Sequence, residues 1–317
     1  ARIVVQDIVS ADGWVPPENV SELLSEAAAY GGIIHSNSWG DDTTEYTARS
    51  GEFDAWSVQM PWSLAFIAPG NTGGTLLEPA NARNVAAIGA STKSESPEKW
   101  PSSSIGPTEY GTFGIFALAP GVSIQSAKAD GISDSYNDDL RSSSGTSMST
   151  PTAAAFAGVL QQMVQDGWLV GSNEPLSNAN LSSISPEWAN LGNNSILLGE
   201  GFAPSGPLLK ALMSVATTGI VDSNNYSIRN YENGFGVLNL SELVDFSALN
   251  NGFIAENISP TPDVWIHDSF RLSDKSPSQW LQERSDGGGS LDDLTNLPWD
   301  GSGATGPFLA TGQNWTK

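Results

Sequence analysis

Short apolar runs alternate with helical patterns along roughly the first 250 residues of the chain. Five runs are typical of buried strands, namely Arg2–Ile8, Ile33–Trp39, Leu64–Ala68, Val85–Ala90 and Gly114–Ala119. Four stretches have the pattern of helices, namely Val20–Tyr30, Phe53–Met60, Pro151–Gln165 and Leu208–Ala216. Strands separated by helices of about ten to fifteen residues form βαβ units, so this order predicts an α/β fold with a mostly parallel sheet flanked by helices.

Polar and small residues mark where some of these elements are expected to begin and end. Asn19 directly precedes the first helical pattern and is a suitable N-cap, because its side chain can accept a hydrogen bond from the first turn. Gly31 and Gly32 are expected to end that helix. The pattern at Pro151–Gln165 has small residues on every face, which suits a helix packed tightly against a sheet.

The alternation of apolar runs and helical patterns ends near residue 250. Before that point, residues 166–206 are rich in Asn, Ser, Gly and Pro and predict a long loop, and Leu238–Phe246 is a last short element. Beyond it, short strand-like pieces lie among turn residues. We therefore predict an α/β domain over residues 1–249, followed over residues 250–317 by the start of a β-sandwich domain that we expect to be incomplete.

Composition excludes several classes of protein. The chain has 317 residues, with 35 acidic and 13 basic side chains, a net charge of −22 and no Cys, so disulfide scaffolds, zinc ribbons and thiol nucleophiles are excluded. So few basic residues argue against nucleic-acid binding, which needs a cationic surface. Two His residues leave little room for a histidine-based metal site. No apolar run approaches the roughly 20 residues of a membrane span.

The segment Ser142–Pro151 (SSSGTSMSTP) carries the most specific chemical signal. Ser147 is expected at the start of a helix, where its backbone N–H points towards a developing oxyanion and the helix dipole favours negative charge. Gly145 lets a substrate approach the backbone, and Pro151 is tolerated in a first turn because its missing N–H would be unpaired there. The spacing differs from the G-x-S-x-G nucleophile elbow, since Ser149 stands where that motif has Gly.

Gly145–Pro151 (GTSMSTP) resembles the nucleophile motif of the subtilisin-like serine proteases, or subtilases, which reads G-T-S-M-[AS]-x-P. The resemblance implies that Ser147 is the catalytic serine. Three further segments are similar to conserved elements of the family in the same order: Asn84–Thr92, Ala119–Val122 and Asn233–Asn239. The matches run from about residue 1 to residue 246 and imply a subtilisin-like fold. The tail is similar to that of subtilases with a C-terminal jelly-roll-type β domain.

The resemblance also implies which groups bind the substrate and the oxyanion. Gly70-Asn71 is similar to the family's A-A-G-N element, whose Asn donates to the oxyanion, although Pro69 stands where Ala is usual. Asn37–Gly40 resembles the strand that pairs with the substrate backbone and walls the specificity pocket. The substrate-binding residues implied in this way are Ser38, Trp39, Gly40, Ala68, Pro69 and Gly70.

The small residues in these segments predict the size of the side-chain pocket. Gly40, Gly70 and the nearby Gly73-Gly74 indicate a roomy pocket that accepts large apolar side chains. The net charge of −22 favours some attraction to cationic substrates.

A serine nucleophile needs a base and a carboxylate that orients the base, and neither family motif for them occurs in this sequence. The family has Asp in D-[ST]-G and His in H-G-T-H, whereas the only histidines here are His35 and His267. His35 is expected to be structural, and His267 lies in the tail. In the family, a strand like Arg2–Ile8 comes shortly after the His helix. We therefore expect the Asp and His to come from a preceding segment or a partner chain, so that the N-terminal part of the domain is missing here.

Three functions remain open on the sequence. The leading hypothesis is a serine endopeptidase that acts on protein or peptide substrates through Ser147, with an oxyanion hole at Asn71. The second is an inactive pseudoprotease that binds peptides. The third is a sedolisin-type peptidase, which shares the fold and works in acid with Glu and Asp beside the serine, although the matches at Asn37–Gly40 and Met148 favour the subtilase branch.

The acidity and the lack of Cys suit a secreted, extracellular protein from a saline or calcium-containing setting. The implied chemistry requires no cofactor, and calcium is expected only as a structural ion. Acidic clusters occur at Asp41-Asp42, Asp138-Asp139 and Asp286–Asp300, but none has the D-x-D-x-D-G spacing of an EF-hand loop. The metal positions therefore stay unknown.

Overall fold

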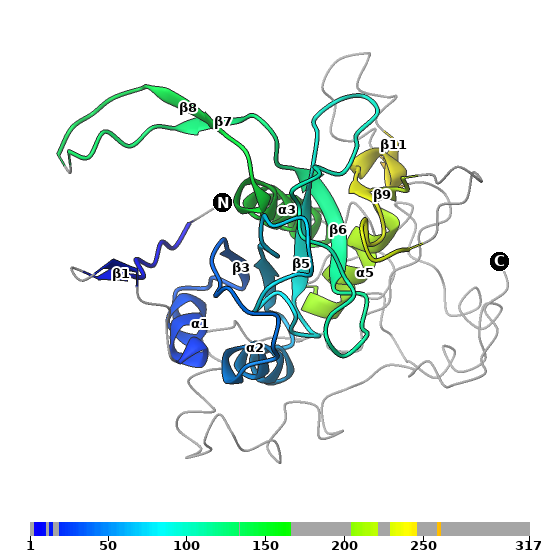
Figure 1. The fold of residues 1–317 in the computed structure, drawn as a ribbon, viewed down its shortest axis with the longest axis horizontal. Coiled ribbons are helices and arrows are strands. Elements are labelled where there is room, and N and C mark those ends of the chain that lie inside the picture. The colour runs from blue at the N-terminus through cyan, green and yellow to red at the C-terminus, as the bar shows by residue number, and fades with distance from the viewer. Residues whose placement is uncertain are drawn as a thin grey trace, which may run out of the picture.

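A six-stranded β-sheet forms the centre of the fold (Figure 1). The computed structural model describes residues 3–10, 13–14, 19–132, 134–165, 204–220, 229–245 and 259–260. The strands lie in the order β3-β4-β5-β6-β10-β9, and every neighbouring pair is parallel except β10 and β9. Their bounds are Ile34–Asn37 for β3, Leu64–Ile67 for β4, Ala86–Ser91 for β5, Ile115–Pro120 for β6, Thr217–Thr218 for β9 and Val237–Leu238 for β10. The predicted mostly parallel sheet is confirmed.

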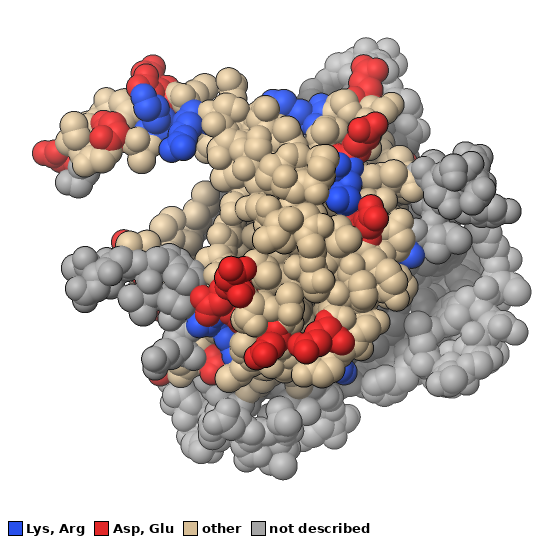
Figure 2. Space-filling view, in the orientation of Figure 1, with Lys and Arg blue, Asp and Glu red and all other residues tan. Residues whose placement is uncertain are grey.

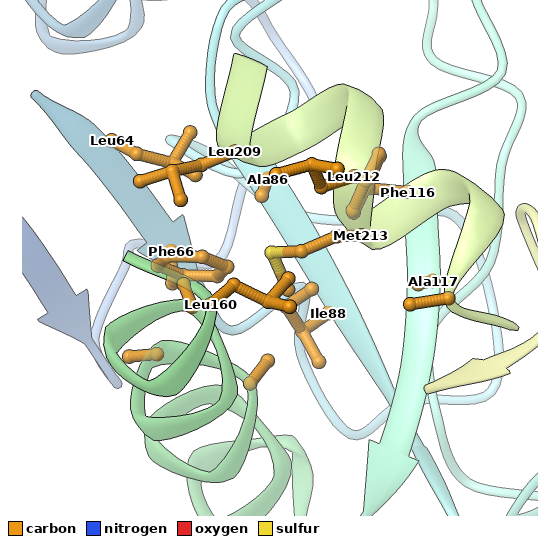
Figure 3. Packing of buried hydrophobic residues seen from close by; sticks show 14 of the residues in the cluster. Leu64, Phe66, Ala86, Ile88, Phe116, Ala117, Leu160, Leu209, Leu212 and Met213 are labelled. Atoms are coloured by element: carbon orange, nitrogen blue, oxygen red, sulfur yellow. The ribbon is translucent and has the colours of Figure 1, made fainter. Parts of the chain in front are cut away.

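Helices cover both faces of this sheet, because alternate strand residues point to opposite sides. On one face Leu64, Phe66 and Ile88 pack with α3 and α5 (Figure 3). On the other face Ala65 and Ile67 pack with α1 and α2. The helices are α1 Val20–Ala29, α2 Ala48–Gln59, α3 Thr146–Gln165 and α5 Gly206–Val215. Burial on both faces explains why the strands read as continuous apolar runs.

Three helices begin before the positions that the pattern predicts. The helix expected from Leu208 begins at Gly206, two residues earlier. The helix expected from Phe53 begins at Ala48, because the polar first turn after Thr47 carries no apolar signal. The helix expected from Pro151 begins at Thr146, so the serine motif itself forms its first turn. By contrast, α1 begins after Asn19 as predicted, and the Asn19 Oδ1 atom accepts a 3.1 Å hydrogen bond from the Glu22 N–H.

The main error in the fold predicted from the sequence is the strand at Arg2–Ile8. Residues 3–8 are extended but pair with no strand among the described residues, and the ladder begins only at Val9. Ile3 and Val5 are 86% and 84% exposed. The Gln6 side chain holds this segment against α1 by donating a 2.8 Å hydrogen bond to the Leu23 carbonyl. An extended run becomes a strand only where a neighbouring strand accepts its hydrogen bonds.

A long hairpin that the sequence pattern did not predict stands away from the sheet (Figure 1). We call residues 122–132 and 134–144 the arm; its strands are β7, Ile124–Ala127, and β8, Leu140–Ser143, which pair antiparallel. The arm exposes Ile132, Tyr136 and Leu140 to 60%, 103% and 63%. In Figure 2 the middle of the visible face carries few charged side chains, whereas charged residues lie along the arm and around the edge of the body.

Small elements complete the described structure. They are strands β1 Val9–Ser10, β2 Gly13–Trp14, β11 Val244–Asp245 and β12 Ser259–Pro260, and the 3₁₀ helix η3 Leu240–Glu242. Within the described ranges no helix combines the length and apolarity needed to cross a membrane. The predicted β domain over residues 250–317 lies outside the described residues except for β12, and so does the predicted loop over residues 166–206 except for its last three residues. Gly206, the last of these, already belongs to α5.

Candidate active site

The residues singled out in the sequence meet at the carboxyl edge of the parallel sheet, where α3 begins. Ser38–Gly40 follow β3, Ala68–Asn71 follow β4, and Gly121 follows β6. The Gly145 N–H donates a 2.8 Å hydrogen bond to the Gly121 carbonyl, which brings the start of α3 to this edge. In open parallel sheets the carboxyl ends of the strands are the usual place for a binding site.

Ser147 is the second residue of α3 and is partly exposed. In the first turn the Ser149 and Thr150 hydroxyls donate to the Thr146 carbonyl at 2.9 and 2.8 Å. The Ser149 hydroxyl is also 3.2 Å from the Ile88 carbonyl of β5, which ties this turn to the sheet. The first N–H groups of a helix have no partner within the helix and favour a negative group. Ser147 therefore lies where the start of α3 would stabilise a negatively charged group.

Asn71 is oriented by Thr146. Its Oδ1 atom accepts hydrogen bonds from the Thr146 N–H at 2.8 Å and the Thr146 hydroxyl at 3.0 Å. An N–H can only donate, so the atom that it meets must be the amide oxygen. The Nδ2 atom, which has no hydrogen-bond partner among the described residues, is left to donate beside the start of α3. Asn71 is itself exposed, so this donor is accessible to a ligand.

The Ser38 hydroxyl binds to Ser147 in place of a helix hydrogen bond that Pro151 cannot make. An α-helix pairs each N–H with the carbonyl four residues earlier, so the Ser147 carbonyl would normally accept from residue 151. Pro151 has no N–H and lies inside α3. The Ser38 hydroxyl donates to the Ser147 carbonyl at 3.0 Å instead. The predicted substrate-binding segment and the predicted nucleophile are therefore in direct contact.

The segment Ser38–Gly40 is held from behind by a buried ion pair. Trp39 packs against Phe53 with ring centroids 6.1 Å apart, and the Arg49 guanidinium lies 5.8 Å above the Trp39 ring. Arg49 pairs with Glu78, whose side chain is fully buried. A Cβ on Gly40 would overlap the Glu78 carbonyl oxygen, so only glycine fits at that position.

The second predicted substrate-binding segment, Ala68–Gly70, is fixed by backbone hydrogen bonds. The Ala68 N–H donates to the Asn37 carbonyl at 3.0 Å, and the Pro69 carbonyl accepts from the Leu77 N–H at 2.9 Å. Gly70 has a φ of +107°, a conformation that favours glycine. All six residues assigned by resemblance to substrate binding therefore lie on the two segments that follow β3 and β4 at the carboxyl edge of the sheet.

Neither histidine of the sequence serves Ser147 as a base among the described residues. His35 lies on β3 and is only 7% exposed; its ring meets Trp56 edge-on at 6.3 Å. Trp56 belongs to the core on the face opposite α3. Burial lowers the pKa of His35 from 6.5 to about 4. His35 is thus a structural histidine, as predicted, and His267 lies outside the described residues.

The burial of His35 leads to a prediction about how the stability of the protein depends on pH. Between about pH 4 and 6.5 the unfolded chain binds more protons at His35 than the folded chain, so stability falls as the pH falls through this window. At about 1.36 kcal/mol per pKa unit, the complete loss is about 3 kcal/mol. Urea unfolding of the intact protein at about pH 7.5 and about pH 4.5 should show most of this loss. His35→Leu should remove that component, and equal pH dependence in both proteins would contradict the prediction.

The expected calcium positions gain no support among the described residues, where no group of three or more His, Asp or Glu could hold a metal ion. Asp41 accepts from Arg49 at 2.7 Å, and Asp139 lies 3.3 Å from the Lys128 ammonium. The cluster Asp286–Asp300 lies outside the described residues. Calcium stays an expectation without a site.

Sequence reasoning missed Thr146, Glu78 and Leu77. Thr146 stands inside the serine motif, and a hydroxyl and N–H one residue before the nucleophile could have suggested a partner for Asn71. Glu78 and Leu77 carry no comparable signal, because both their backbone and their side-chain contacts with the site form only when the chain has folded.

Comparisons with known proteins agree with this geometry. The model of the subtilase family matches residues 1–202. The chain is 23% identical over 373 residues to the serine protease/ABC transporter B family protein tagD of Dictyostelium discoideum, covering 84% of this chain and 19% of that protein. It is 33% identical over 154 residues to the serine protease AprX of Bacillus subtilis (strain 168), covering 42% of this chain and 34% of that protein. The chain thus spans about a fifth to a third of the length of these relatives.

A similar fold is known from a solved structure. The structure of the prenylagaramide maturation protease PagA superposes with a TM-score of 0.50 at 22% sequence identity, covering 74% of this chain and 70% of that chain. This similarity concerns the fold, since the identity is low.

Proposed function

Because this chain belongs to the subtilase family, we propose that it supplies the nucleophile and oxyanion donors of a serine endopeptidase. The observation that carries the proposal is the arrangement at the start of α3. Ser147 stands in the first turn, and the Asn71 amide is turned by Thr146 so that its Nδ2 atom can donate there. These are the parts that acyl transfer requires around a reacting carbonyl.

The proposed reaction starts with the substrate lying along Ser38–Gly40 and Ala68–Gly70 as an added strand, held by main-chain hydrogen bonds. The Ser147 hydroxyl oxygen attacks the peptide carbonyl carbon while a base takes its proton. The Ser147 N–H and the Asn71 Nδ2 atom donate to the oxyanion that forms. The amine leaves with the proton from the base, and water then hydrolyses the acyl-enzyme.

We propose that the base and its carboxylate come from chain outside these 317 residues, either a preceding segment or a separate chain. Two observations support this. Among the described residues β3 has a strand neighbour only on its β4 side. The extended residues 3–8 carry exposed Ile3 and Val5 and pair with no described strand. Unpaired strand edges favour the addition of another strand, so this region can receive the missing piece.

The alternatives differ in what accompanies Ser147. An inactive pseudoprotease would bind peptides at the same two segments without a base, and a sedolisin-type enzyme would use carboxylates and work in acid. A secreted, extracellular location and a structural calcium ion complete the proposal; the supporting observations are the lack of Cys, the net charge of −22 and the acidic clusters.

A fluorophosphonate probe tests the proposed function. Applied to the intact folded protein at neutral pH, it should label Ser147 covalently, because only a serine activated by a base reacts readily. Peptide mapping by mass spectrometry locates the label, and Ser147→Ala is the matched control. A folded protein whose Ser147 stays unlabelled would favour the pseudoprotease, and labelling confined to acid would favour the sedolisin type.

A further inference from the structure

We infer that Leu77 limits the substrate residue on the acyl side of the scissile bond to a small side chain. The inference rests on the proposed function, because it names the substrate class of the same site. It differs from the roomy pocket that the glycines Gly40, Gly70, Gly73 and Gly74 predict in the sequence. The reason is that the space freed by a glycine is available to a substrate only if no other side chain fills it.

The backbone at Leu77 and Glu78 touches both substrate-binding segments. The Leu77 N–H donates a 2.9 Å hydrogen bond to the Pro69 carbonyl, on the segment Ala68–Gly70. The Glu78 carbonyl lies so close to Gly40 that a Cβ there would overlap it. Leu77 therefore lies against one segment and Glu78 against the other.

The Leu77 side chain fills the space in front of Gly70. A Cβ added to Gly70 would lie 3.0 Å from the Leu77 Cδ1 atom and 3.2 Å from its Cγ atom, and 3.0 Å from the hydroxyl of the buried Ser104. Leu77 is half-buried, whereas its neighbours Leu76 and Glu78 are 0% and 1% exposed. Of these three residues Leu77 alone is partly exposed, so a substrate side chain entering beside Gly70 would meet it.

The same geometry argues against a basic substrate residue. A carboxylate could attract Lys or Arg, and Glu78 is the nearest one in sequence to Leu77. Both of its oxygens are occupied, since Oε1 pairs with Arg49 and Oε2 accepts from the Thr47 hydroxyl at 2.9 Å. A small uncharged side chain, such as that of alanine or serine, is therefore the class that fits.

Hydrolysis of two matched peptides tests the inference in the intact protein. The peptides differ only at the residue before the scissile bond, which is alanine in one and phenylalanine in the other. We expect kcat/KM to be at least about tenfold higher for the alanine peptide, a factor typical of steric discrimination in an apolar pocket. Leu77→Ala should raise kcat/KM for the phenylalanine peptide by about tenfold or more.

The matched control is Leu76→Ala, which removes the same atoms from the adjacent position. Leu76 packs in the core, so this variant should lower the melting temperature and leave the ratio of the two kcat/KM values unchanged. A wild-type protein that cleaves both peptides equally well, or a Leu77→Ala variant with an unchanged ratio, would overturn the inference.

Binding separates this inference from the proposed function. In the Ser147→Ala background, fluorescence anisotropy can compare labelled peptides that end in alanine or phenylalanine, with and without Leu77→Ala. The alanine peptide should bind more tightly, and Leu77→Ala should reduce the difference. If this preference is present while the wild type hydrolyses nothing, the proposed function fails and the inference stands. Equal affinity, or no binding of either peptide, overturns the inference itself.

Discussion

Ser147→Ala is expected to lower kcat for peptide hydrolysis by about 10⁶-fold, the scale established for the nucleophile of subtilisin. The alanine side chain offers no oxygen to attack the carbonyl, so the acyl-enzyme cannot form. Because Ser147 is tied to Ser38 through its backbone carbonyl, the substitution leaves that hydrogen bond in place. The measurement is steady-state hydrolysis by the intact protein, with circular dichroism to confirm folding.

Ser142→Ala is the matched control for the nucleophile. Ser142 lies in the same serine run but is exposed on β8, four residues before α3 begins. Its replacement should change kcat by no more than about twofold, as expected for a surface substitution outside the site. If Ser147→Ala retained hydrolysis within tenfold of the wild type, another residue would have to be the nucleophile.

Asn71→Leu is expected to lower kcat by about 10²- to 10³-fold with little change in KM, the scale established for the corresponding donor of subtilisin. Asn71 lies one residue beyond the proposed substrate-binding segment, and in the proposed mechanism its Nδ2 atom donates only to charge that develops on the carbonyl oxygen. An interaction made mainly in the transition state affects kcat rather than KM. Initial rates over a range of peptide concentrations separate the two parameters.

Thr146→Val distinguishes the donor from the group that orients it. This variant removes the hydroxyl that donates to the Asn71 Oδ1 atom but keeps the backbone N–H, which donates to the same oxygen at 2.8 Å. One neutral hydrogen bond contributes about 1 kcal/mol, so kcat should fall by no more than about tenfold. A larger fall for Thr146→Val than for Asn71→Leu would contradict the assigned roles.

The sequence predicts the sheet well where apolar runs are buried on both faces. Leu64–Ala68 and Val85–Ala90 became β4 and β5 nearly at the predicted bounds, because continuous apolarity reflects local burial. Residues 3–8 have the same pattern but no ladder, since pairing depends on a neighbour and not on the segment alone. Periodicity likewise reports nothing about an exposed hairpin, which explains why the arm was missed.

The features of the site can likewise be divided into those that the sequence predicts and those that depend on the folded chain. Ser147 and Asn71 could be found because each stands in a contiguous motif, and the structure brings both to one sheet edge. The orientation of the Asn71 amide and the tie between Ser38 and Ser147 depend on contacts between residues 75 and 109 positions apart. Leu77 comes to lie beside Gly70 only once the chain has folded back, so the glycine pattern alone gives no sign of this contact.

The arm can change in length without changing the geometry around Ser147. Its base is closed by the hydrogen bond from the Gly145 N–H to the Gly121 carbonyl at 2.8 Å and by that from the Ser123 N–H to the Ser144 hydroxyl at 2.9 Å. Residues at the tip can therefore be added, deleted or replaced without moving the start of α3. The tip is a natural position for inserting a tag, a fluorophore or a whole domain, and a place where related proteins can diverge while keeping the same reaction centre.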